Sequence, residues 1–97
     1  MVVFEVEKSK LNEVKRKLEE DNIVSRQTLK FRDATSLGLE KDVYYIVIEG
    51  SNEAIDRARE IIKSIGSEVT GKEADTILNK IKEQESAADQ GFGSLFG

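Results

Sequence analysis

Apolar and polar side chains alternate in three short stretches of the chain, residues 2–7, 23–32 and 43–49. Alternation with a period of two is typical of β-strands, because successive side chains of a strand point to opposite faces of the sheet. In the second stretch Leu29 and Phe31 alternate with basic residues, so we expect one apolar face and one basic face. The third stretch is apolar on both faces, which indicates that something covers each side of the sheet there.

Three other stretches repeat their apolar residues at helical spacing, near residues 10–21, 52–65 and 72–86. The second carries the widest apolar stripe, which is typical of a helix that packs on a sheet. Ser51 is placed to cap its first turn and Gly66 to end it. Thr70 and Glu73 match a capping box, so we predict that the third helix begins there.

The predicted order of elements is β-α-β-β-α, followed by a last helix. Between the last two helices, the pattern leaves open whether residues 67–70 form a short strand. Such an order favours an α+β two-layer sandwich, with an antiparallel sheet of three to four strands and two helices on one face. A ferredoxin-like fold requires the strand at residues 67–70, whereas a TATA-binding-protein-like arrangement fits without it. The extra C-terminal helix either joins the other helices or covers Val43, Tyr45 and Val47 on the outer face.

The composition indicates one folded domain followed by a different C-terminal segment. Hydrophobic residues are 38% and charged residues 35% of the 97, which is typical of a globular domain of minimal size. We predict a single α+β domain over residues 1–86. Residues 87–97 are rich in glycine and phenylalanine and show no periodicity, so we predict a flexible tail there.

Two residue types that carry much of enzyme chemistry are missing, because the chain has no cysteine and no histidine. A thiolate nucleophile, the usual general base and the commonest metal ligand are therefore absent. Residues 66–73 (GSEVTGKE) come one position from a phosphate-binding P-loop, but Glu73 stands where the motif needs a hydroxyl for magnesium. We predict no enzyme activity, no cofactor and no metal site.

The net charge bears on the class of partner, and the length of the apolar runs bears on the cellular location. A net charge of −4 argues against a general nucleic-acid binder, whose affinity comes largely from neutralising phosphates. No apolar run approaches the roughly 20 residues of a membrane span. The N-terminal stretch lacks the pattern of a signal peptide. We expect a cytoplasmic protein, and the high charge content without cysteine is typical of a thermophile.

Residues 43–65 (VYYIVIEGSNEAIDRAREIIKSI) resemble the closing strand and helix of a KH RNA-binding domain. The Gly-x-x-Gly loop with which that family grips nucleic acid has no counterpart in this chain, so the resemblance implies packing only. Residues 41–48 (KDVYYIVI) resemble part of the base-stacking motif of RNA-recognition domains. This second resemblance makes Tyr45 a candidate base-stacking residue.

Beside Tyr45, three basic side chains complete a candidate nucleic-acid site, namely Arg26, Lys30, Arg32. The alternative, which we favour, is that these cations pair across the sheet with three acidic residues, namely Glu5, Glu7, Glu49. The first interpretation predicts affinity for single-stranded nucleic acid. The second predicts a neutralised surface.

The C-terminal residues 90–97 (QGFGSLFG) resemble the tail of archaeal and eukaryotic acidic ribosomal stalk proteins. The matching positions are Gly91, Phe92, Gly93, Leu95 and Phe96. Those tails recruit translation factors, so the resemblance implies a partner-binding tail whose contact residues are Phe92, Leu95 and Phe96.

In size, acidity and element order the chain resembles small archaeal proteins with a TATA-binding-protein-like sandwich. Our leading hypothesis is a non-catalytic interaction module that binds a protein partner, or a second copy of itself, through the outer sheet face and the tail. The alternatives are a nucleic-acid-binding domain that uses the basic stripe, and a regulatory domain that binds a small ligand.

Overall fold

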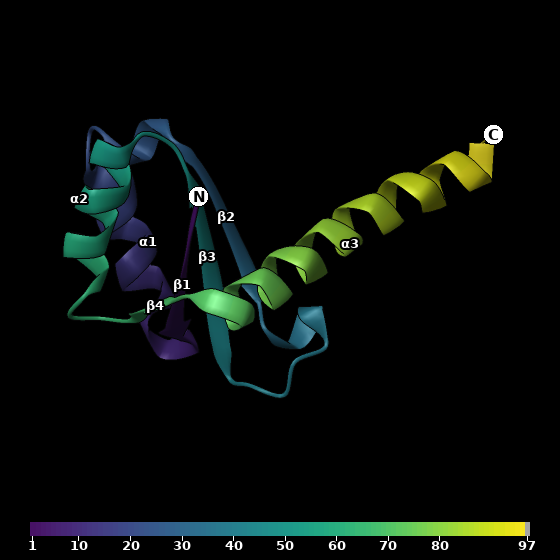
Figure 1. The fold of residues 1–97 in the computed structure, drawn as a ribbon, viewed down its shortest axis with the longest axis horizontal. Coiled ribbons are helices and arrows are strands. Elements are labelled where there is room, and N and C mark those ends of the chain that lie inside the picture. Colours follow the sequence, from purple (N-terminus) through teal and green to yellow (C-terminus); the bar gives the residue numbers. More distant parts are fainter. Residues whose placement is uncertain (97) are drawn as a thin grey trace.

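The computed structural model describes the backbone of residues 1–96 and the side chains of residues 1–86 (Figure 1). Its strands and α-helices are β1 (Val2–Glu7), α1 (Leu11–Glu20), β2 (Thr28–Asp33), β3 (Val43–Glu49), α2 (Asn52–Ile62), β4 (Ser67–Val69) and α3 (Gly71–Phe96). Three single-turn 3-10 helices lie between them, η1 (Lys8–Lys10), η2 (Val24–Arg26) and η3 (Thr35–Leu37). The α+β prediction is confirmed. Among the described residues, no helix combines the length and the apolar character of a membrane span.

The four strands form one antiparallel sheet in the order β2-β3-β1-β4. The short strand that the sequence left open is therefore present as β4, and it pairs with β1. The ferredoxin-like alternative requires this strand. β2 begins at Thr28, later than predicted, because the carboxylate of Asp21 accepts the backbone N–H groups of Ile23 and Val24 and holds the chain in a helical turn.

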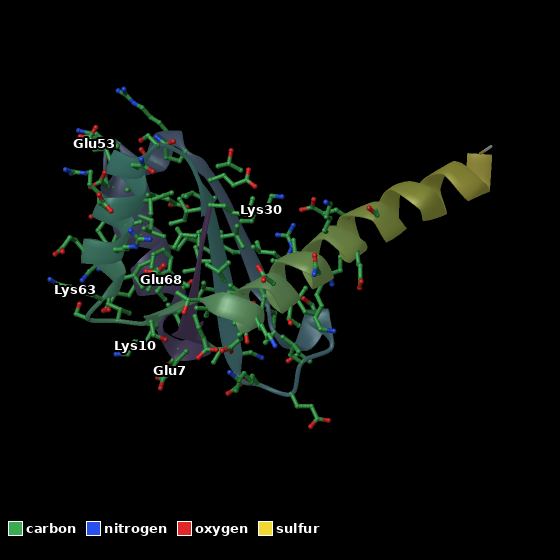
Figure 2. All side chains as sticks on the ribbon, viewed as in Figure 1. Glu7, Lys10, Lys30, Glu53, Lys63 and Glu68 are labelled. Carbon is green, nitrogen blue, oxygen red and sulfur yellow. The ribbon has the colours of Figure 1, made fainter. Side chains whose placement is uncertain are left out.

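Helices α1 and α2 cover one face of the sheet (Figure 1). Val14 and Leu18 of α1 and Ile62 of α2 are fully buried against Phe4 and Ile46. Their helical spacing puts one apolar stripe of each helix against the sheet. Charged side chains point outward, as Figure 2 shows for Glu53 of α2 and for Lys63, which directly follows that helix.

Gly66 has no room for a side chain, because an added Cβ would lie 2.5 Å from the carbonyl oxygen of Glu5 and from Val6. This close approach brings the end of α2 directly onto β1. The residue predicted as a helix-ending glycine therefore also allows β4 to pair with β1.

Helix α3 lies on the other face of the sheet, which settles the position that the sequence left open. Ile77 and Ile81 are 1% and 3% exposed and pack in one cluster with Val3, Tyr45 and Val47. Beyond the sheet, α3 continues away from the body of the molecule, and its last turns project as an isolated rod (Figure 1).

Candidate functional site

The structure brings together three of the four residues predicted to bind nucleic acid. Lys30 and Arg32 lie on the outer face of β2, and Arg32 is paired with Tyr45 of β3 in the sheet register. Arg26 is separate, because it is an exposed residue of η2, before the strand begins. The expected single basic stripe is therefore shorter than the sequence suggested.

Both cations of this face pair with one carboxylate of α3. Lys30 Nζ lies 2.9 Å from Oε1 of Glu85, and Arg32 Nη2 lies 3.4 Å from the same oxygen. The hydrogen bond from Lys30 lowers the pKa of Glu85, and the charge of Arg32 adds to the effect. The prediction that acidic residues of neighbouring strands neutralise these cations is wrong, because the carboxylate that pairs with them belongs to Glu85 of α3.

Tyr45 is only 1% exposed and lies in the cluster that contains Ile77 and Ile81. Burial raises the pKa of its hydroxyl. A ring in this position is not accessible to a nucleotide base while α3 stays on the sheet. The nucleic-acid hypothesis therefore requires α3 to leave, and in that form it stays a prediction.

Further polar contacts hold α3 at both ends of its docked part. Near the first turn, Lys41 bridges Glu5 at 3.1 Å and Glu73 at 3.3 Å. The other end of the docked part carries Glu85, twelve residues after Glu73. Next to it, the side-chain amide of Gln84 donates to the carbonyl oxygen of Ser36 at 2.6 Å. These groups are largely solvent-exposed, so each contributes little to stability and acts mainly on orientation.

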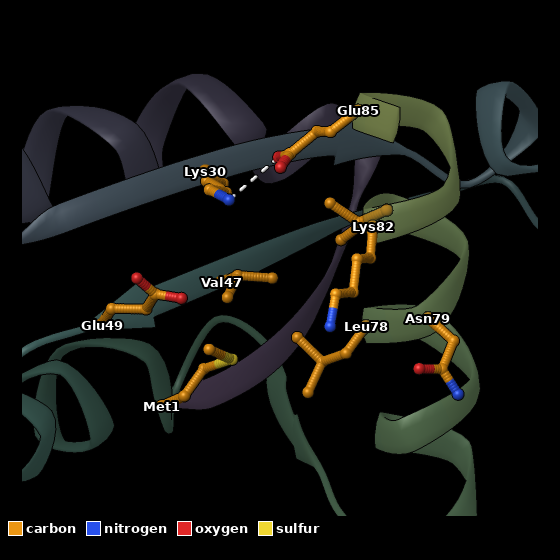
Figure 3. Close-up of a pocket in the computed structure, with 9 residues that line it drawn as sticks. Met1, Lys30, Val47, Glu49, Leu78, Asn79, Lys82 and Glu85 are labelled. Atoms are coloured by element: carbon orange, nitrogen blue, oxygen red, sulfur yellow. Dashed lines mark hydrogen bonds and ion pairs between the residues drawn. The ribbon is translucent and has the colours of Figure 1, made fainter. Parts of the chain in front are cut away.

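A groove of about 340 Å³ runs between α3 and the outer sheet face (Figure 3). Val47 and Leu78 give it an apolar floor, and Lys30 and Glu85 close one side with their ion pair. Lys82 lines it from α3. This volume is at the lower end of small-molecule sites.

Glu49 of β3 also lines the groove, across from Lys82 of α3 (Figure 3). Among the described side chains, neither of the two forms an ion pair. The groove can hold a small polar molecule, but it offers no pair of nucleophile and base. The small-ligand alternative stays a prediction, and the groove is where such a ligand would bind.

Residues 1–86 contain no group of three or more acidic residues arranged to hold a metal ion. Phe92, Leu95 and Phe96 lie outside the residues whose side chains are described, although the backbone of α3 reaches Phe96. Sequence reasoning missed Glu85. Its spacing of four from Ile81 and eight from Ile77 would have placed it on the docking side of the helix.

Comparison of the chain with family models, with curated proteins and with solved structures found no match.

Proposed function

We propose that the protein is a non-catalytic interaction module that binds a protein partner through the C-terminal part of α3, residues 87–97. The observation that carries the proposal is the path of α3, whose first half is seated on the sheet while its backbone continues away from the body to Phe96 (Figure 1). The other surface considered from the sequence, the apolar outer face of β3, is covered by that same helix. The end of α3 is thus the better-supported contact surface.

The chemistry of the tail supports this choice. Phe92, Leu95 and Phe96 stand at positions i, i+3 and i+4, which share one side of a helix. An amphipathic helix of this kind binds by placing its apolar side in a groove of the partner. Burial of each of these side chains contributes about 2 kcal/mol.

The resemblance to ribosomal stalk tails makes a translation factor the partner class to test first. A cytoplasmic location, expected from the sequence, is consistent with such a partner. The partner itself is expected to supply an apolar groove, because residues 87–97 carry a single charged side chain, Asp89.

The test is a titration of the full chain with a purified archaeal translation elongation factor, followed by isothermal calorimetry. We expect Phe92→Ala, Leu95→Ala and Phe96→Ala each to weaken binding by about tenfold or more, as removal of a buried anchor residue does. Ser94→Ala is the matched control, because it changes the same segment without removing an anchor. Absence of binding, or equal losses in all four variants, would contradict the proposal.

A further inference from the structure

The seat of α3, by which we mean the patch of the outer sheet face on which the helix packs, is small. Its buried part is Ile77 and Ile81, with Ala74 and Leu78 partly buried beside them. Charged and polar contacts from Glu73, Gln84 and Glu85 surround it, and all of these groups come from a continuous stretch of the helix. The α3 helix of a second copy of the chain therefore fits the same seat.

The segment that joins α3 to the sheet is short and solvent-exposed. β4 ends at Val69, Thr70 is exposed, and α3 begins at Gly71. Gly71 has a φ of 65°, and an added Cβ would meet nothing within 4 Å. A glycine changes between positive and negative φ at little cost. Rotation at this residue therefore turns α3 away from its own sheet without moving the strands, and the uncovered outer face is then open to the helix of a second copy.

From these two observations we propose that α3 exchanges between two copies of the chain, so that the helix of each copy covers the outer sheet face of the other. The contacts that close the face are the same in the exchanged dimer and in the monomer. The two states therefore differ mainly in the cost of association and in the hinge, and protein concentration sets their ratio.

The exchange goes beyond the proposed binding function, because the exchanged dimer carries two C-terminal tails. A partner with two binding grooves would then bind both tails, and the second contact would form at a high effective concentration. The binding of a single tail to a single groove does not depend on the exchange, so the two proposals fail or succeed separately.

The first experiment compares two glycine variants by sedimentation velocity over a range of protein concentrations. Gly71→Ala strains the backbone of the monomer, because alanine tolerates a positive φ poorly, and opening of the hinge relieves this strain. We therefore expect the protein concentration at which half of the chains are dimeric to fall at least about fivefold. Gly38→Ala is the matched control, because Gly38 has a φ of 79°, is also surrounded by open space, and lies outside the hinge. Equal behaviour of the two variants would overturn the proposal.

The second experiment uses the natural hinge and the absence of cysteine from the chain. One preparation carries Ser36→Cys and another carries Gln84→Cys, two positions that the 2.6 Å hydrogen bond brings together. The two are mixed at high concentration and treated with a short bismaleimide cross-linker. Exchange predicts a covalent dimer that contains one chain of each kind.

Lys72→Cys replaces Gln84→Cys in the control mixture, because Lys72 is exposed and lies twelve residues, roughly 18 Å, before Gln84 on the same helix. We expect the mixed cross-linked dimer to be at least about fivefold less abundant in this control, since the two thiols are then too far apart for a short cross-linker. A protein that stays monomeric, or that dimerises without the mixed cross-link, would show that α3 remains on its own sheet.

Discussion

At the scale of single residues, Asp21 is the most highly connected carboxylate of the described side chains. It accepts the backbone N–H groups of Ile23 and Val24 at 2.9 and 3.0 Å, and the guanidinium of Arg57 donates to both of its oxygens. The hydrogen bond from Arg57 is the largest cause that holds the pKa of Asp21 well below its usual value. The residue joins the end of α1 to α2 and also initiates η2.

This depressed pKa predicts a specific loss of stability in acid. Because the folded-state pKa lies below the unfolded value of about 3.9, the contribution of Asp21 is complete above that value and is lost as the pH falls below it. We expect Asp21→Asn to be less stable than the natural chain at pH 7 and to lose less stability between about pH 5 and pH 2.5. Urea unfolding at several pH values measures this.

The control for Asp21→Asn is Asp75→Asn, which removes an exposed carboxylate with no described ion-pair partner. Asp75→Asn should follow the stability profile of the natural chain at every pH. If Asp21→Asn follows it too, the ion pair with Arg57 does not stabilise the folded state.

At the scale of elements, α3 packs on the outer face of the sheet beside η3, and its buried contacts come from two isoleucines. Replacing Ile77 by alanine removes a fully buried side chain, so we expect a loss of about 2 to 5 kcal/mol in the free energy of unfolding. Thr76→Ala changes an exposed neighbour on the same helix and should cost much less. Chemical denaturation measures both, and equal losses would mean that the seat of α3 is not what stabilises the outer face.

The same variant tests the nucleic-acid hypothesis, because loosening α3 uncovers Tyr45 and frees Lys30 and Arg32 from Glu85. If these residues bind single-stranded RNA, Ile77→Ala must bind it more tightly than the natural chain in a titration at low salt. Lys30→Glu must then abolish the gain. Unchanged affinity in the loosened variant would leave the basic residues with a structural role only.

At the scale of the whole molecule, the sheet is covered unequally on its two faces. The inner face carries α1 and α2, each of which lies between two strands in the chain, whereas the outer face carries α3, which follows β4 through Thr70 and Gly71. The last buried side chain among residues 1–86 is that of Ile81. The cooperative unit should therefore end shortly after this residue.

Truncation tests that boundary. Removal of residues 87–97 should change the melting temperature by no more than about 1 °C, because surface changes away from buried groups have small effects. A longer truncation that ends at Lys80 also removes Ile81, and it should lower the melting temperature by about 8 °C or more. Differential scanning calorimetry compares the three chains. A large loss on removal of residues 87–97 alone would place the tail within the folded unit.

Much of the fold could be predicted from the sequence because the signals are local. The alternation in residues 43–49 and the stripe of α2 depend only on side-chain geometry along one strand or helix. β3 has the predicted bounds, and α2 begins where expected but ends at Ile62, three residues early. Ser51 caps α2 through a hydrogen bond to Ala54, as its place before the apolar stripe predicts. β2 was predicted too long, since the hydrogen bonds of Asp21 compete with alternation at residues 23–26.

The sequence by itself determined the three longer strands, the three α-helices with their apolar stripes, and the absence of histidine and cysteine chemistry. Only the tertiary structure decided that α3 lies on the outer face, and with it the burial of Tyr45 and the pairing of Lys30 and Arg32 with Glu85. Lys30 and Glu85 are 55 residues apart, and no periodicity within one element reports on a contact at that separation. The partner of a charged side chain is fixed by which surfaces pack together, and that choice depends on the free energy of the whole chain.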